Sequence, residues 1–244
     1  MVPLAQSPGR CTDRLGMVFA LVTALLATAC QPADAVVPDL RQPSAERVVA
    51  GSLQGHTGAH LIVRDAASRV EVRLAELPGL LYRISTPADS GLAPRVTGDA
   101  SRVRLRLRPT GDDGPDTVTI LLNRAVRWDI RMPAGAGEQR LDLTGGSVAR
   151  VDLGSSGLLD IRLPPPRGTV PVTFRGGVGS VTVEAPRGSP VRFRLWAGAG
   201  SVDTPWTANN GSFAGEIVAD PVWSAAADRY AVNARAGVGS LTLR

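Results

Sequence analysis

A short glycine motif recurs through the second half of this chain and restricts the folds open to it. Gly-x-Gly followed by Ser and an apolar residue begins at Gly177, Gly198 and Gly237, and a degenerate copy begins at Gly135. The copies are offset by 42, 21 and 39 residues, close to multiples of one unit of about 20 residues. Because a unit of that size is one coil of a β-solenoid, the spacing predicts a solenoid.

The rest of the chain alternates apolar and polar residues, which is the pattern of half-buried strands. The clearest examples are residues 69–74, 102–108, 126–132 and 191–195, each with one face of Val, Leu, Ile, Phe, Met or Trp. No stretch beyond residue 46 shows a convincing helical stripe with caps. We therefore expect an all-β chain.

The fold class that we expect is a single-chain β-solenoid, with a β-sandwich opening onto a β-solenoid as the alternative. Residues 46–132 would form an N-terminal β region and residues 133–244 the repeat solenoid. A sandwich of hairpins should show two-residue Asn-Gly or Asp-Gly turns, and the repeat region has only one, at 210–211. The recurring glycine pair instead predicts a corner with positive φ at which neighbouring coils stack closely.

The N-terminus carries the features of a bacterial export signal. Arg10 and Arg14 precede an uncharged run over residues 15–29, which is too short to span a bilayer comfortably. The run ends in Leu-Ala-Thr-Ala before Cys30, and small residues before a cysteine resemble the lipobox of bacterial lipoproteins. The alternative is a plain secretory signal with a chance cysteine at its end.

This reading divides the start of the chain into two segments. Residues 1–29 are the predicted signal peptide, and residues 30–45 are a lipidated Cys30 with a Pro-containing tether. No cysteine follows Cys30, so no disulfide is expected in the exported part. The predicted location is extracytoplasmic, on a membrane held through the lipid anchor.

The glycine motif also carries a family resemblance. The motif at Gly177, the strand that follows, residues 184–186 (Glu-Ala-Pro) and the second copy at Gly198 are similar to toastrack-type domains of unknown function. Such domains resemble the C-terminal half of LiaF-type cell-envelope stress proteins. The resemblance is best over residues 126–206 and implies a right-handed β-solenoid. It supplies no catalytic residues, and the absence of a transmembrane bundle separates this chain from LiaF-type proteins.

Charge suggests a partner. All 27 basic residues are Arg, against 22 acidic residues, so the whole chain has a formal net charge of +5. Four arginines alternate along one strand and share one face: Arg102, Arg104, Arg106 and Arg108. On a tethered protein such a stripe suits anionic lipid headgroups or an anionic envelope polymer. The alternative is a solvated strand edge whose charges discourage aggregation.

Two tryptophans and three aspartates are further candidates. Trp206 and Trp223 flank an irregular stretch, which would form either a binding loop or a plug over the end of the solenoid. Asp142, Asp152 and Asp160 lie at the centres of short strands and could form an acidic ladder. Paired carboxylates hydrolyse glycosidic bonds, so an envelope polysaccharide hydrolase is an alternative function.

We therefore expect a non-enzymatic surface lipoprotein that binds, senses or scaffolds at the cell envelope. Its partner would be an anionic polymer or another envelope protein, and a purely structural spacer is a further alternative. We expect no cofactor, no metal and no nucleic acid, since aromatic residues for base stacking are not interleaved with the arginines. The final strand, residues 239–244, would leave an open solenoid end at which a second copy could add strands.

Overall fold

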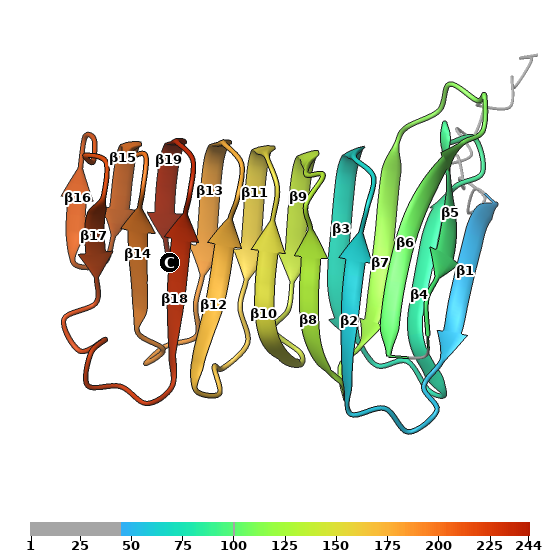
Figure 1. The fold of residues 1–244 in the computed structure, drawn as a ribbon, viewed down its shortest axis with the longest axis horizontal. Helices are drawn as coiled ribbons and strands as arrows, with labels where there is room; N and C mark the ends of the chain where they lie inside the picture. Colours follow the sequence, from blue (N-terminus) through green and yellow to red (C-terminus); the bar gives the residue numbers. More distant parts are fainter. Residues whose placement is uncertain (1–44, 100) are drawn as a thin grey trace, which may run out of the picture. The chain divides into compact units, whose positions relative to one another are not determined.

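The structure is a computed structural model that describes residues 45–99 and 101–244. These residues form nineteen β-strands and no helix (Figure 1). Sheet A contains ten strands in the order β1 (Glu46–Ser52), β4 (Leu80–Pro87), β7 (Thr117–Asn123), β3 (Ala67–Ala75), β9 (Ala136–Asp142), β11 (Ser156–Arg162), β13 (Val178–Glu184), β19 (Val238–Leu243), β15 (Ala199–Thr204) and β16 (Thr207–Asn209). Sheet B contains nine in the order β17 (Glu216–Ala219), β14 (Val191–Leu195), β18 (Arg229–Ala234), β12 (Thr169–Phe174), β10 (Ser147–Leu153), β8 (Arg127–Met132), β2 (Gly58–Val63), β6 (Arg102–Pro109) and β5 (Leu92–Thr97).

Most strands follow one another as pairs, one strand in sheet B and the next in sheet A. The seven pairs are β2–β3, β6–β7, β8–β9, β10–β11, β12–β13, β14–β15 and β18–β19. Neighbouring pairs are hydrogen-bonded in parallel in both sheets. Each pair is therefore one coil of a solenoid. The prediction of an all-β solenoid is confirmed.

The coils are not stacked in chain order. The last coil, β18–β19, lies between β12–β13 and β14–β15, so the C-terminus lies within the row of strands rather than at its end (Figure 1). The prediction of an open edge at residues 239–244 is wrong, because β19 pairs on one side with β13 and on the other with β15.

The other end of the stack repeats this arrangement. The coil β2–β3 lies between β6–β7, which follows it in the chain, and β8–β9. Antiparallel strands complete both ends: β1, β4 and β5 at one, β16 and β17 at the other. The strands before and after residue 132 thus belong to the same two sheets, joined through the pairs β2–β8 and β3–β9.

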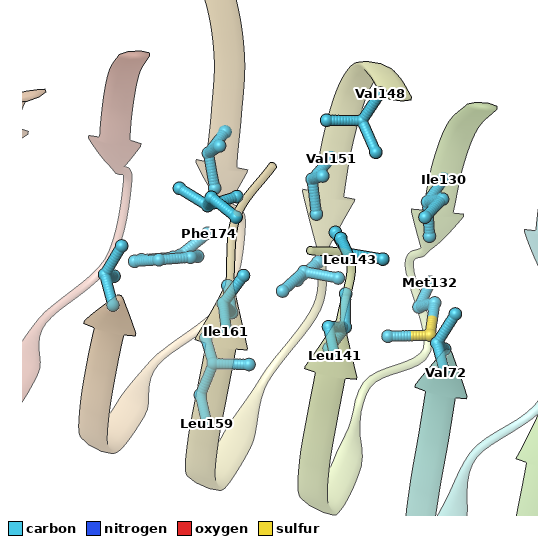
Figure 2. Packing of buried hydrophobic residues seen from close by; sticks show 14 of the residues in the cluster. Val72, Ile130, Met132, Leu141, Leu143, Val148, Val151, Leu159, Ile161 and Phe174 are labelled. Carbon is cyan, nitrogen blue, oxygen red and sulfur yellow. The ribbon is translucent and has the colours of Figure 1, made fainter. Parts of the chain in front are cut away.

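The hydrophobic core lies between the two sheets. Its buried cluster runs from Ala59 to Leu243, and its largest fully buried side chains are Trp128, Tyr230, Phe174 and Phe193. Figure 2 shows part of the cluster, with residues from both sheets in one layer. Residues 42–244 form one compact unit that contains this whole cluster, so we expect this unit to fold by itself.

The second glycine of each motif allows neighbouring coils to approach closely. A Cβ atom on Gly179 would lie 2.6 Å from the carbonyl oxygen of Gly157, and one on Gly200 would lie 2.6 Å from that of Gly239. A Cβ on Gly239 would overlap the carbonyl oxygen of Gly179. These glycines therefore form a ladder that runs across the coils.

The first glycine of the motif has a different role. Gly135 and Gly198 have φ values of 74° and 78°, in the left-handed region, as expected for a corner. Gly177 and Gly237 do not have positive φ, so the expected positive φ at every copy is wrong for these two. Close stacking, rather than the corner conformation, is the property that all copies of the motif share.

We expect Gly239→Ala to lower the free energy of unfolding of residues 42–244 by about 2–3 kcal/mol, because the methyl group would force two coils apart. The measurement is urea unfolding followed by circular dichroism. Gly237→Ala is the matched control from the same motif, since a Cβ there meets no atom within 4 Å. Equal effects of the two substitutions would contradict the ladder.

Candidate polyanion-binding face

The outer faces of the two sheets differ in charge. The strands of sheet B carry eleven arginines and three carboxylates, a net charge of +8. The strands of sheet A carry six arginines and seven carboxylates, a net charge of −1. None of the eleven arginines is buried. The positive charge is therefore concentrated on sheet B.

Strand β6 has the highest density of arginine. The predicted stripe is Arg102, Arg104, Arg106 and Arg108. The residues between them are buried in the core, with exposed fractions of 2% for Val103, 0% for Leu105 and 5% for Leu107. Burial of one face thus turns all four arginines outward.

The position of β6 weakens the alternative of a protective edge. It is paired on one side with β2 and on the other with β5, so it is not an edge strand. The edge strand is β5, which has Pro94 in the sheet and places Arg95 directly opposite Arg106. Like charges directly opposite each other destabilise a strand pair, and an anionic ligand would relieve this repulsion.

The two faces also differ in how many of their arginines form salt bridges. All six arginines of sheet A form salt bridges, to carboxylates on their own or neighbouring strands or loops. On sheet B, only Arg106 and Arg131 do so, to Asp65 and Asp129. Nine of the eleven arginines on the strands of sheet B thus have no carboxylate partner among residues 45–99 and 101–244.

Two carboxylates on sheet B are nearly buried beneath arginines. Asp129 accepts hydrogen bonds from the guanidinium of Arg131 at 2.9 and 2.8 Å. Asp152 is held in the same two-point way by Arg175, at 2.6 and 2.5 Å. These two acids neutralise their own partners and leave the charge of β6 unchanged.

Burial works to raise the pKa of Asp129. The hydrogen bonds from Arg131 and the charges of Arg131, Arg150 and His60 act in the opposite direction and outweigh burial. The pKa of Asp129 therefore lies below its ordinary value. His60 Nδ1 lies 3.4 Å from Asp129 Oδ2, which places this imidazole beside the same carboxylate.

The acidic ladder that was considered as an alternative for the three aspartates is not formed. Asp152 lies on β10 of sheet B, whereas Asp142 and Asp160 lie on sheet A. Across neighbouring strands, Asp142 is opposite Arg162 and Asp160 is opposite Arg140. Acids and arginines alternate from coil to coil, so sheet A presents a mixed-charge surface rather than an acidic row.

The two predicted tryptophans of the irregular stretch lie apart. Trp206 is half-buried and packs against the core. The Trp223 ring lies between the guanidinium groups of Arg192, at 3.8 Å, and Arg229, at 4.2 Å, and its Nε1 donates a hydrogen bond to the Tyr230 carbonyl oxygen at 2.7 Å. Both indoles thus contact other residues of the solenoid rather than forming one binding loop.

Strand β14 also belongs to the charged face, which was not predicted from the sequence. Arg192 and Arg194 point outward there, and the Arg194 guanidinium lies 3.8 Å from the Trp196 ring centre. The signal was available, because the alternating pattern that ends at Leu195 continues to Trp196.

The predicted anchor cannot be placed. Cys30, the signal segment at 1–29 and most of the tether at 30–45 lie outside the described residues. Within residues 45–99 and 101–244, no helix is long and apolar enough to cross a bilayer.

Comparison with known proteins identifies the fold and no family. No family model matches the chain, and no curated protein matches it. The crystal structure of a candidate cell adhesion protein from Clostridium sporogenes is similar, with a TM-score of 0.61 and 16% identity, over 82% of this chain and 99% of that one.

Two further crystal structures were matched, both of candidate adhesins. One, from Bacteroides fragilis, has a TM-score of 0.27 and 7% identity over 82% of this chain and 97% of that one. The other, from Parabacteroides distasonis, has a TM-score of 0.23 and 9% identity over 83% and 98%. Scores this low support no conclusion, so the shared fold rests on the Clostridium protein.

The lowered pKa of Asp129 predicts a pH-dependent stability. The carboxylate stabilises the fold fully above its unfolded-state pKa of about 3.9, and this contribution is lost as pH falls through the lower folded-state pKa. We expect Asp129→Asn to cost about 1–3 kcal/mol at pH 7 and progressively less below about pH 4. Urea unfolding at pH 7, 5 and 3 measures this.

The matched control is Asp203→Asn, at an exposed residue of β15 that forms no salt bridge with a described residue. A loss that is the same at all three pH values would contradict the role given to the Asp129 charge.

Proposed function

We propose that this protein is a non-enzymatic lipoprotein of the bacterial surface that binds an extended anionic polymer of the envelope through the outer face of sheet B. The proposal rests on a contrast in ion pairing among the described residues. Every arginine on the strands of sheet A has a carboxylate partner there, and nine of the eleven on the strands of sheet B have none. Unpaired cations on one face are a binding surface for anions.

The spacing of the arginines favours a linear ligand. Alternate residues of a strand lie about 6.7 Å apart, so the four arginines of β6 span about 20 Å in a straight line. Neighbouring strands are about 4.8 Å apart, which adds Arg95 on β5 to the same patch. A chain of regularly spaced phosphates, sulfates or carboxylates would match several of these cations at once.

Two further observations support a surface role. The lipobox-like residues before Cys30 favour a protein exported and held on a membrane. The structurally similar protein from Clostridium sporogenes is a candidate cell adhesion protein, and the solenoid fold agrees with the toastrack resemblance of the glycine motifs. An adhesive or polymer-binding role agrees with the lipobox-like residues, with the similar Clostridium protein and with the toastrack resemblance.

We expect residues 42–244 to bind dextran sulfate with an affinity that falls at least tenfold between 50 mM and 500 mM salt, because salt screens exposed charges. Uncharged dextran is the neutral control. Binding is measured by biolayer interferometry on the immobilised polymers. Salt-resistant binding, or equal binding to dextran, would contradict an electrostatic face.

The variant for this experiment is Arg104→Ser with Arg108→Ser, since neither residue forms a salt bridge with a described residue. We expect at least tenfold weaker binding. Arg140→Ser with Arg162→Ser removes the same charge from sheet A and should change the affinity less than twofold. Equal losses would show that only net charge matters, and absence of binding would favour a structural spacer.

The anchor has a separate test. We expect the full chain, expressed in a bacterial host, to incorporate labelled palmitate and to fractionate with membranes, and Cys30→Ala to abolish the labelling. Mass spectrometry of the mature N-terminus identifies the cut. Release of an unmodified protein by the unaltered chain would favour the plain secretory signal.

A further inference from the structure

Exposed apolar side chains gather at the end of the stack opposite to β1 and β5. Four of the six large hydrophobic residues that are exposed lie between residues 196 and 222, with exposed fractions of 48% for Trp196, 87% for Phe213, 53% for Ile217 and 58% for Val222. Gathered exposed apolar residues mark interaction surfaces more often than single ones do.

Backbone pairing places the segments that carry the exposed residues side by side. Strand β17 runs antiparallel to β14, with Ile217 opposite Arg194. The amide of Gly215 donates a hydrogen bond to the Leu195 carbonyl oxygen at 2.7 Å, which places the loop that carries Phe213 beside the start of Trp196. The Phe213 amide donates to Glu216 Oε2 at 2.9 Å and fixes the turn.

This loop borders an open hollow. Its lining includes Asn209, Asn210, Gly211, Phe213 and Glu216. Two side-chain amides, a carboxylate and an exposed aromatic ring offer hydrogen-bond donors, acceptors and an apolar platform within one site. A sugar ring presents the matching pattern, with hydroxyl groups around its rim and C–H groups on its face.

The adjacent arginines specify the charge of the ligand. Arg192 and Arg194 form no salt bridge with a described residue, and the Nε atom of each is buried without a hydrogen-bond partner. Arg194 stacks on Trp196, which holds its guanidinium at the border of the exposed rings. A carboxylate, sulfate or phosphate on a sugar would pair with this group.

We propose that this end of the solenoid is a second binding site, for the sugar units of an acidic glycan. Phe213 and Trp196 provide the platforms, Asn209, Asn210 and Glu216 the hydroxyl contacts, and Arg194 the charge contact. The carboxylate of Glu216 and the two amides beside Phe213 favour a glycan over a bilayer surface, into which such groups insert poorly.

The site is independent of the arginine stripe on β6. In the order of sheet B, β14 and β17 lie at one end and β6 and β5 at the other. It is also the end opposite to β1, the first described strand.

Tryptophan fluorescence tests the proposal on residues 42–244. Trp196 is the most exposed of the four tryptophans, whereas Trp128 is fully buried and the other two are half-buried. We expect tetragalacturonate, a hyaluronan tetrasaccharide or sialyllactose to shift the emission, and Trp196→Phe to remove most of the shift. Fully methyl-esterified tetragalacturonate and lactose, the uncharged counterparts, should bind at least tenfold more weakly.

Calorimetry with the same acidic sugars should show at least tenfold weaker binding for Phe213→Ala and for Arg194→Ser. Leu158→Ala, at another exposed apolar residue, on sheet A, is the control and should bind as the unaltered protein does. Circular dichroism checks that each variant is folded.

Three results would overturn the proposal. The first is no binding of any acidic sugar by the folded protein. The second is loss of binding in the Arg104→Ser, Arg108→Ser variant and not in Phe213→Ala, which would assign the sugars to β6. The third is binding to phosphatidylglycerol vesicles, and not to sugars, that depends on Phe213.

Discussion

Close parallel stacking of successive coils is the constraint on which the rest of this structure depends. The strands of five neighbouring coils bring their backbones together at one position in each coil. The glycines at this position form a ladder without side-chain atoms: Gly137, Gly157, Gly179, Gly239 and Gly200. The close approach lets the parallel hydrogen bonds continue across the corner between the sheets. It also fixes the register, because a slip of one residue would place a side chain against a carbonyl oxygen. The outward position of each arginine follows from that register.

The ends of the stack show a second constraint, which is to close a repeating structure without leaving long open edges. At one end the chain runs past a position, forms β14–β15, and returns to fill the position with β18–β19. At the other end β2–β3 comes first in the chain, and the later coils β6–β7 and β8–β9 pair on either side of it. Antiparallel strands then occupy the outermost places, and two of the four, β16 and β17, are short. Edge strands promote unwanted pairing between molecules, and β5 with Pro94, β16 with three residues and β17 with four limit it. The irregular stretch after Thr204 is the connection that makes this return.

Local pattern predicted the elements and could not predict their neighbours. Alternation in residues 102–108 gave both the strand and the outward direction of its arginines, because burial of one face depends only on neighbouring residues. The repeat length likewise predicted one coil for about every 20 residues, because this spacing is visible in the sequence itself. The position of β19 in the sheet depends on its pairing with β13 and β15, which are distant in the sequence. The residues of β19 itself, 238–243, have no feature that distinguishes an inner strand from an end strand. The possible acidic ladder of the three aspartates was wrong for a similar reason. Each aspartate points outward on its strand as expected, but their alignment depends on the register and on the sheet to which each strand belongs. Phe213 was not predicted to be a site residue, because it lies in a loop without an alternating pattern.

The division of charge between the two faces is accompanied by a division of ion pairing. On sheet A, ion pairs between neighbouring strands, such as Arg69 with Glu138 and Arg162 with Glu184, contribute to the stacking of coils. On the strands of sheet B, only Arg106 and Arg131 are paired with a carboxylate among the described residues, through Asp65 and Asp129. On β6, Arg102, Arg104 and Arg108 have no carboxylate partner among the described residues, and Arg106 lies opposite Arg95 of the edge strand β5. A spacer gains nothing from such a strand. A protein whose function is to hold an anion gains its binding energy from it, because the repulsion present in the free protein is relieved when the ligand binds.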